Sequence, residues 1–63
     1  GIMKPLTELY SDDMSRKAVI VKDEIGYLVQ FYEHDQLIEL RELYDYSIQY
    51  AEDAAENWVQ FII

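Results

Sequence analysis

The residues of this chain that could do chemistry are chiefly acids near its end. Glu52, Asp53 and Glu56 stand three or four positions apart and would project from one side of a helix. Such a side could be a solvated surface, a contact for a basic partner, or a site for a divalent cation. A carboxylate metal site usually draws ligands from several elements, so one helix face argues against a metal. The solvated surface is the simplest interpretation, and a contact for a basic protein is the functional one.

Catalytic chemistry finds less support in the sequence. His34 is the only histidine, and it stands between Glu33 and Asp35 with no serine, cysteine or second histidine beside it. The chain has no cysteine and no glycine-rich loop that could hold a phosphate. A chain of 63 residues can barely enclose the cleft that general acid–base catalysis requires. We therefore interpret His34 as an ordinary turn residue and expect no enzyme, no catalytic residue, no metal and no cofactor.

Aromatic side chains are the more informative group, because six tyrosines, two phenylalanines and one tryptophan are many for so short a chain. A tyrosine buries its ring while its hydroxyl stays hydrated, which suits thin cores and interfaces alike. We expect four aromatic residues between a sheet and a helix: Tyr27, Phe31, Tyr50 and Trp58. Four others exceed what one helix can cover and are predicted to contact a second protomer or another protein: Tyr32, Tyr44, Tyr46 and Phe61.

The charge limits the partners that this protein can have. The net charge is −8, and residues 23–63 carry ten acids against one base. This surface repels phosphate backbones and anionic lipids, so we expect neither nucleic acid nor membrane as a partner. The longest aliphatic run, AVIV at residues 18–21, is too short to cross a bilayer. We expect a cytoplasmic protein of one small domain, stabilised by self-association into a homodimer or a larger oligomer.

The clearest local pattern predicts a β-hairpin over residues 17–33. The runs KAVIV and YLVQFYE are rich in β-branched and aromatic residues, and KDEIG stands between them. Gly26 is placed to adopt the left-handed conformation that closes such a turn. In the second run Tyr27, Val29 and Phe31 would point one way, and Leu28, Gln30 and Tyr32 the other. An unpaired AVIV run would be an adhesive edge, which favours pairing between chains.

Residues 34–44 are ambiguous. They fit a third strand with Glu39 and Arg41 on one side, and they also fit the start of a long helix over residues 35–62. Apolar residues recur at helical spacing from Tyr44 to Ile62. Ser47, which follows two bulky tyrosines, is a good N-cap. We favour a strand, a corner at residues 44–47 and a helix from about residue 47 to residue 62.

The predicted fold is α+β, with an antiparallel meander of two or three strands packed against one C-terminal helix. A hairpin with one long helix over residues 35–62 is the alternative. Residues 1–16 are expected to form an N-terminal arm or a short helix, since Pro5 suits a first helical turn and Leu6, Leu9 and Tyr10 would share a face. Residues 17–63 are expected to form a single ββ(β)α domain.

The segment YAEDAAENWV, residues 50–59, resembles a group of small uncharacterised acidic proteins of tailed marine phages. The similarity extends over residues 26–59, about half the chain, and leaves the N-terminal segment outside. The resemblance implies a β-meander followed by a helix. If the protein is viral, the expected cytoplasm is that of the host cell. The resemblance implies no activity. The commonest form of the group has a histidine before the serine, where this chain has Tyr46.

These observations favour a small non-enzymatic protein-binding or assembly module. The alternative is an acidic decoy that imitates the charge of a nucleic acid and occupies the binding site of a basic host protein. The two hypotheses use different residues, because a decoy depends on the acids of the last helix and an assembly module on uncovered aromatic rings.

Overall fold

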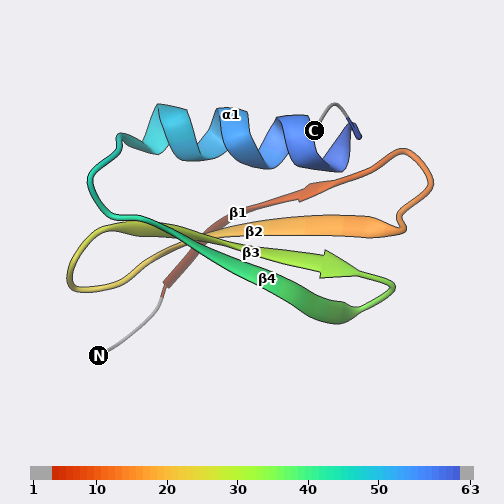
Figure 1. Ribbon diagram of the computed structural model, residues 1–63, viewed down its shortest axis with the longest axis horizontal. Coiled ribbons are helices and arrows are strands. Elements are labelled where there is room, and N and C mark those ends of the chain that lie inside the picture. Colours follow the sequence, from red (N-terminus) through yellow and green to blue (C-terminus); the bar gives the residue numbers. More distant parts are fainter. Residues whose placement is uncertain (1–3, 62–63) are drawn as a thin grey trace.

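The chain forms a four-stranded antiparallel sheet with one helix lying across one face (Figure 1). The computed structural model describes residues 4–61. The elements in chain order are β1 (Lys4–Tyr10), β2 (Arg16–Lys22), β3 (Tyr27–Glu33), β4 (Gln36–Leu43) and α1 (Ile48–Val59). Each strand pairs with the next along the chain, so the sheet order is β1-β2-β3-β4. The predicted α+β class is confirmed, and the expected number of strands was too low.

The predicted hairpin is confirmed as β2 and β3. The two strands pair in a regular register from Arg16 opposite Glu33 to Lys22 opposite Tyr27. Side chains alternate between the two faces of a strand, and residues directly opposite each other share a face. Val29 and Phe31 accordingly join the cluster under the helix, while Leu28 belongs to a second cluster on the other face.

The N-terminal segment is a strand, so the prediction of an arm or a short helix for residues 1–16 was wrong for its described part. β1 pairs with β2 from Lys4 opposite Lys22 to Tyr10 opposite Lys17. The register shifts between Pro5 and Thr7, where a β-bulge accommodates the proline on an edge strand. Sequence periodicity gave no sign of this pairing, because a tertiary contact with β2 decides it.

In the last part of the chain the favoured prediction, a strand and then a helix, is confirmed. The alternative, one long helix over residues 35–62, is wrong. β4 ends at Leu43, and a turn in which the Tyr46 N–H donates to the Leu43 carbonyl oxygen leads into α1. Ser47 is the N-cap, and its Oγ accepts a hydrogen bond of 3.2 Å from the Tyr50 N–H. This bond satisfies one of the free N–H groups at the start of the helix.

Two turns differ in their backbone conformation from what the sequence suggests. Gly26 does not have a positive φ, so the expected left-handed glycine was wrong. The glycine instead relieves a close approach, because a Cβ atom would lie 3.1 Å from the Tyr44 carbonyl oxygen and would push it slightly aside. Four other described residues have a positive φ, Met14, His34, Asp35 and Phe61, and two of them are adjacent: His34 and Asp35, with φ of 51° and 67°. Two such residues form the tight type I′ turn that joins β3 to β4.

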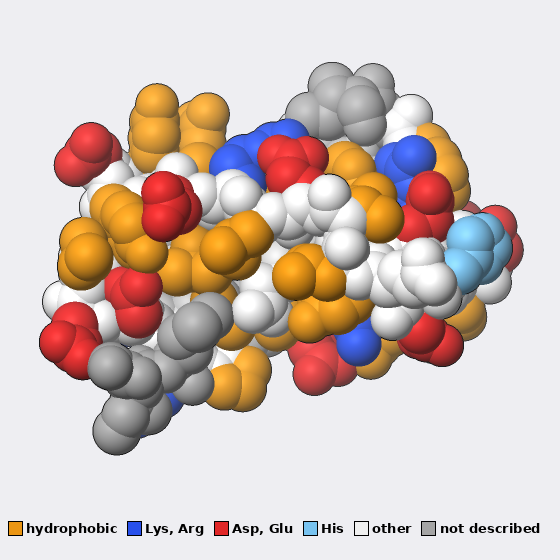
Figure 2. Space-filling model, turned by 60° about the horizontal axis from the view of Figure 1, so that its bottom comes forward, with side chains coloured by type: hydrophobic (Ala, Val, Ile, Leu, Met, Phe, Trp, Pro, Cys, Tyr) orange, Lys and Arg blue, Asp and Glu red, His pale blue; other side chains and the backbone are white. Residues whose placement is uncertain are grey.

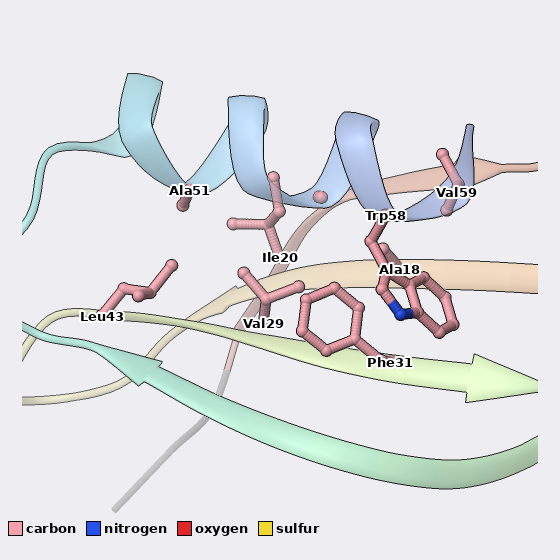
Figure 3. Close-up of a cluster of buried hydrophobic side chains, with 9 residues drawn as sticks. Ala18, Ile20, Val29, Phe31, Leu43, Ala51, Trp58 and Val59 are labelled. Atoms are coloured by element: carbon pink, nitrogen blue, oxygen red, sulfur yellow. The ribbon is translucent and has the colours of Figure 1, made fainter. Parts of the chain in front are cut away.

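The core lies between the sheet and α1 (Figure 3). Ala51 and Ala55 are fully buried, and their small side chains let the helix backbone lie close to the strands. Trp58 fills the space beyond them, with its ring centroid 4.7 Å from that of Phe31. Figure 3 also shows how Ile20 and Val29 point from the sheet towards the helix. These aromatic and aliphatic contacts hold the helix to the sheet.

Two expectations about apolar residues were wrong. Tyr50 was expected in the core but is 48% exposed, because the buried side of α1 runs through Ala51 and Ala55 and leaves Tyr50 beside it. The AVIV run was considered as a free edge, but β2 lies inside the sheet between β1 and β3. Ile62, the last residue of the predicted helical series, falls outside the described residues.

Candidate interaction surface

One face of the sheet carries no further element of the described chain. α1 covers the opposite face, where it packs mainly on β2 and β3. Figure 2 brings the side away from the helix forward, and apolar side chains are spread across it between charged ones. We call this surface the helix-free face. The strand registers assign it these residues: Pro5, Glu8, Tyr10, Lys17, Val19, Val21, Leu28, Gln30, Tyr32, Leu37, Leu40 and Glu42.

The helix-free face has a buried apolar centre. Val19, Val21 and Leu28 are at most 7% exposed although no helix covers them. Two half-buried side chains, Tyr32 and Tyr44, pack against this cluster. The strands therefore form a second, smaller apolar layer without a second helix.

Around this centre stand apolar side chains that remain open. Tyr10, Leu37 and Leu40 are each about half exposed, and they come from both edge strands. An exposed contiguous apolar patch often marks an interface, and with the half-buried Tyr32 between the two edges these are the residues of this face available to form one. These three residues were missed by sequence reasoning. Their place on one face depends on β1 being a strand and on the β3–β4 register.

Few charges interrupt the helix-free face. Of the 13 acids in the chain, only Glu8 and Glu42 belong to it by register. The Tyr10 hydroxyl donates a hydrogen bond of 2.6 Å to Glu8, which raises the pKa of Tyr10. The Lys17 ammonium lies 4.6 Å from the ring centroid of Tyr32, a cation–π contact that orients both side chains. The remaining acids lie in turns, on α1 or on the helix side of the sheet.

The structure separates the four aromatic residues that were predicted to contact a partner. Tyr32 and Tyr44 share the helix-free cluster, and the Tyr44 hydroxyl donates a 2.8 Å hydrogen bond to Asp23. This bond raises the pKa of Tyr44 to about 12, and hydrogen bonds from the Gly26 N–H and then from Tyr44 lower the pKa of Asp23. Tyr46 lies in the turn before α1 and is stacked on Tyr50, with 4.1 Å between the ring centroids.

Phe61 lies beyond the end of α1, where Arg16 contacts several residues. The Arg16 guanidinium lies 3.9 Å from the Phe61 ring centroid and 4.6 Å from that of Trp58. It also donates to the Trp58 carbonyl oxygen at 2.9 Å and to Glu33 at 3.2 Å. A cation at this end of a helix balances the partial negative charge of its free carbonyl groups. Phe61 is thus held by a cation although it is 55% exposed.

The acidic residues of the helix form a separate surface. Glu52, Asp53 and Glu56 are all exposed, on the side of α1 away from the sheet. Glu56 also borders an open hollow of about 770 Å³ between the end of α1 and the β1–β2 turn, together with Asp12 and Asp13. Within residues 4–61, no group of three histidine, cysteine or acidic side chains is arranged to hold a metal ion.

His34 lies in the exposed β3–β4 turn, as its sequence neighbours suggested. Its backbone N–H donates a 2.8 Å hydrogen bond to the Ser15 carbonyl oxygen, which ties this turn to the end of the β1–β2 turn. The backbone of His34 thus has a structural part in joining two neighbouring loops.

Comparison with protein-family models, curated proteins and solved structures finds no match to this chain. Over the described part of the chain, no helix combines the length and the apolar character needed to cross a lipid bilayer.

Proposed function

We propose that this protein is a small non-enzymatic protein-binding or assembly module that docks through the helix-free face of its sheet. The observation that carries this proposal is the set of half-exposed apolar residues, Tyr10, Leu37 and Leu40, around the buried centre of that face. Covering them removes apolar surface from water, at roughly 25 cal/mol for each Å². The partner is a second copy of the chain or another protein.

The distribution of charge supports this use of the face. A chain of net charge −8 repels its own kind at long range, yet its acids are almost absent from the helix-free face. Depletion of charge at the centre of a patch is typical of protein interfaces, and so is the presence of tyrosine. The resemblance to phage proteins and the lack of cysteine favour the cytoplasm of a host cell as the place of action.

The second candidate is the acidic decoy. The exposure of Glu52, Asp53 and Glu56 on one side of a helix that carries no basic residue favours it. Such a surface would attract the nucleic-acid site of a basic protein, and the attraction would weaken steeply with salt.

Capture of binding proteins from a bacterial lysate, at low and at high salt, distinguishes the two functions. One variant, Tyr10→Ser with Tyr32→Ser, makes the helix-free face polar. The matched variant replaces the helix acids by their amides, with Glu52→Gln, Asp53→Asn and Glu56→Gln. Circular dichroism checks that both variants keep the fold, and sedimentation measures self-association of each.

An assembly module keeps its partner at high salt and with the amide variant, and loses it with the serine variant. A decoy shows the reverse pattern, with binding abolished by salt and by the amide variant. If the folded serine variant binds and self-associates like the natural chain, the helix-free face is not the docking surface and the proposal is wrong.

A further inference from the structure

The sheet has two edge strands, and they differ in how open they are to further pairing. β1 and β4 stand at the ends of the sheet order, and an unpaired edge can pair with another chain. β1 is blunted by Pro5 and by the bulge between Pro5 and Thr7. β4 has its irregularity only near its start, and its pairing with β3 is regular from Glu39 to Leu43. Figure 1 shows β4 at the edge of the sheet farthest from α1.

The middle of β4, residues 39–41, is complementary to itself. Residues 38–42 read IELRE. If two copies run antiparallel about a two-fold axis through Leu40, Leu40 meets the partner's Leu40 and Glu39 lies opposite the partner's Arg41. The symmetry repeats the Glu39–Arg41 pair, so two pairs of opposite charge flank the central leucines. Opposite charges directly across a strand pair stabilise it.

Other registers are less favourable. Paired side chains must share a face, so the axis has to pass through a residue and not between two residues. An axis through Glu39, Arg41 or Glu42 places like charges against each other. An axis through Ile38 places the β4 irregularity, which lies opposite Phe31 and Tyr32, at the centre of the pairing. Only the axis through Leu40 combines opposite charges with a centre, residues 39–41, that lies in the regular part of the strand.

The two faces of β4 suit this arrangement. Glu39 and Arg41 lie on the helix side of the sheet, opposite Phe31 and Val29, and Leu40 lies on the helix-free face opposite Gln30. The Arg41 guanidinium is held 4.8 Å from the Phe31 ring centroid and its Nε 2.9 Å from Glu39. Both charged side chains are about 40% exposed, so each can exchange its contact within the strand for one with the opposite charge of a partner strand. α1 packs mainly on β2 and β3, so two copies approach along β4 without the helices meeting first.

We propose that two copies of this chain pair through β4, antiparallel about Leu40, and form a continuous eight-stranded sheet with both helices on one face. This inference rests on the assembly part of the proposed function and adds a second contact, between two copies along the β4 edge, to the docking on the helix-free face. The dimer also joins the two helix-free faces into one larger apolar surface with Leu40 at its centre.

Complementary charge variants test this register. Glu39→Arg makes positions 39 and 41 both basic, and Arg41→Glu makes both acidic. Each variant alone places like charges opposite each other twice, so its dimer constant should weaken roughly tenfold or more. An equimolar mixture pairs a basic strand with an acidic one and should form a heterodimer at least as tight as the natural homodimer. Sedimentation of the natural chain, of each variant and of their mixture measures all four constants.

Glu56→Arg makes on α1 the same change of charge as Glu39→Arg, but away from β4, and should leave the dimer constant equal to that of the natural chain. Circular dichroism confirms that each variant is folded. A monomeric natural chain, or variants that self-associate like the natural chain, would overturn the β4 dimer.

The serine variant of the helix-free face separates this inference from the proposed function. Its dimer should persist if β4 is the contact. Capture of a lysate protein through the helix-free face by a chain that does not dimerise would leave the proposed function standing and refute the β4 dimer.

Discussion

Asp13 shows at the scale of one residue how a polar turn is stabilised. One of its carboxylate oxygens accepts hydrogen bonds from the Ser15 N–H at 3.0 Å, the Ser15 hydroxyl at 2.8 Å and the Ser11 hydroxyl at 2.9 Å. These bonds favour the ionised form, and they lower the pKa of Asp13 to about 2. Ser11 is itself buried and accepts a bond from the Arg16 N–H. The turn between β1 and β2 is thus organised around one carboxylate.

We predict that Asp13→Asn destabilises the fold near neutral pH and that the difference from the natural chain disappears in acid. The folded-state pKa of Asp13 is depressed, so its contribution is fully present above the unfolded value of 3.8 and is lost as the pH falls towards 2. Urea unfolding at several pH values between these limits and neutrality measures the difference. Asp12→Asn removes a charge from the same turn, and an equal effect of that variant would show that net charge and not the hydrogen bonds is responsible.

The helix is stabilised at the scale of an element by its cap and its buried side. α1 has no acid in its first turn and no base in its last, so its own side chains do little to balance the helix dipole. Three acids on its outer side also repel each other slightly. Packing of Ala51, Ala55 and Trp58 on the sheet offsets both effects. The Ser47 cap sets the residue at which the helix begins.

We predict that Ser47→Ala lowers the free energy of unfolding by about 1 kcal/mol, because the Tyr50 N–H loses its hydrogen-bond acceptor. Ser47→Asp keeps an acceptor and adds a charge that suits the start of a helix, so it should be close to neutral or stabilising. Urea unfolding followed by circular dichroism measures both variants. Equal destabilisation by alanine and aspartate would show that the cap bond contributes nothing.

The whole molecule is thin, since one helix and one sheet share a single main core. A chain of this length is stable by only about 3 to 9 kcal/mol, at the usual 0.05 to 0.15 kcal/mol for each residue. The packing of the helix on the sheet depends heavily on the contact between Trp58 and Phe31. The Arg16 guanidinium stacks on the Trp58 ring. The second apolar layer, on the helix-free face, is covered by no helix of the described chain.

We predict that Trp58→Ala lowers the free energy of unfolding by about 3 to 5 kcal/mol, which removes most of the stability of the molecule. Trp58→Phe keeps a ring against Phe31 and Arg16 and should cost clearly less. Circular dichroism during urea unfolding measures both variants, since the alanine variant has no tryptophan fluorescence. A fully folded alanine variant with a natural unfolding midpoint would contradict the importance of this contact.

Local sequence patterns predicted correctly those elements whose side-chain periodicity and end signals all indicate the same secondary structure. The alternation from Tyr27 to Tyr32 indicated a strand with two different faces, and the structure has both. Ser47 and the spacing of Ala51, Ala55 and Trp58 indicated the start and the buried side of the helix. In these stretches the side chains that form the contacts also determine the backbone conformation, so the sequence alone predicts the structure.

The candidate site was predicted less well. Tyr32 and Tyr44 were correctly placed away from the helix layer, but Tyr10, Leu37 and Leu40 could not be grouped with them. Their common face follows from the registers of two edge strands, and a register is a long-range property that no single stretch of sequence contains.

The sequence by itself therefore determined the central hairpin, the capped helix and the apolar residues that join them, because each depends on neighbours along the chain. Only the tertiary structure decided that residues 4–10 form a strand, that β2 lies inside the sheet, and that Tyr50 is left outside the core. Those features depend on which segments meet across the sheet. Strand pairing takes its partners from distant parts of the chain, so local propensity does not predict it.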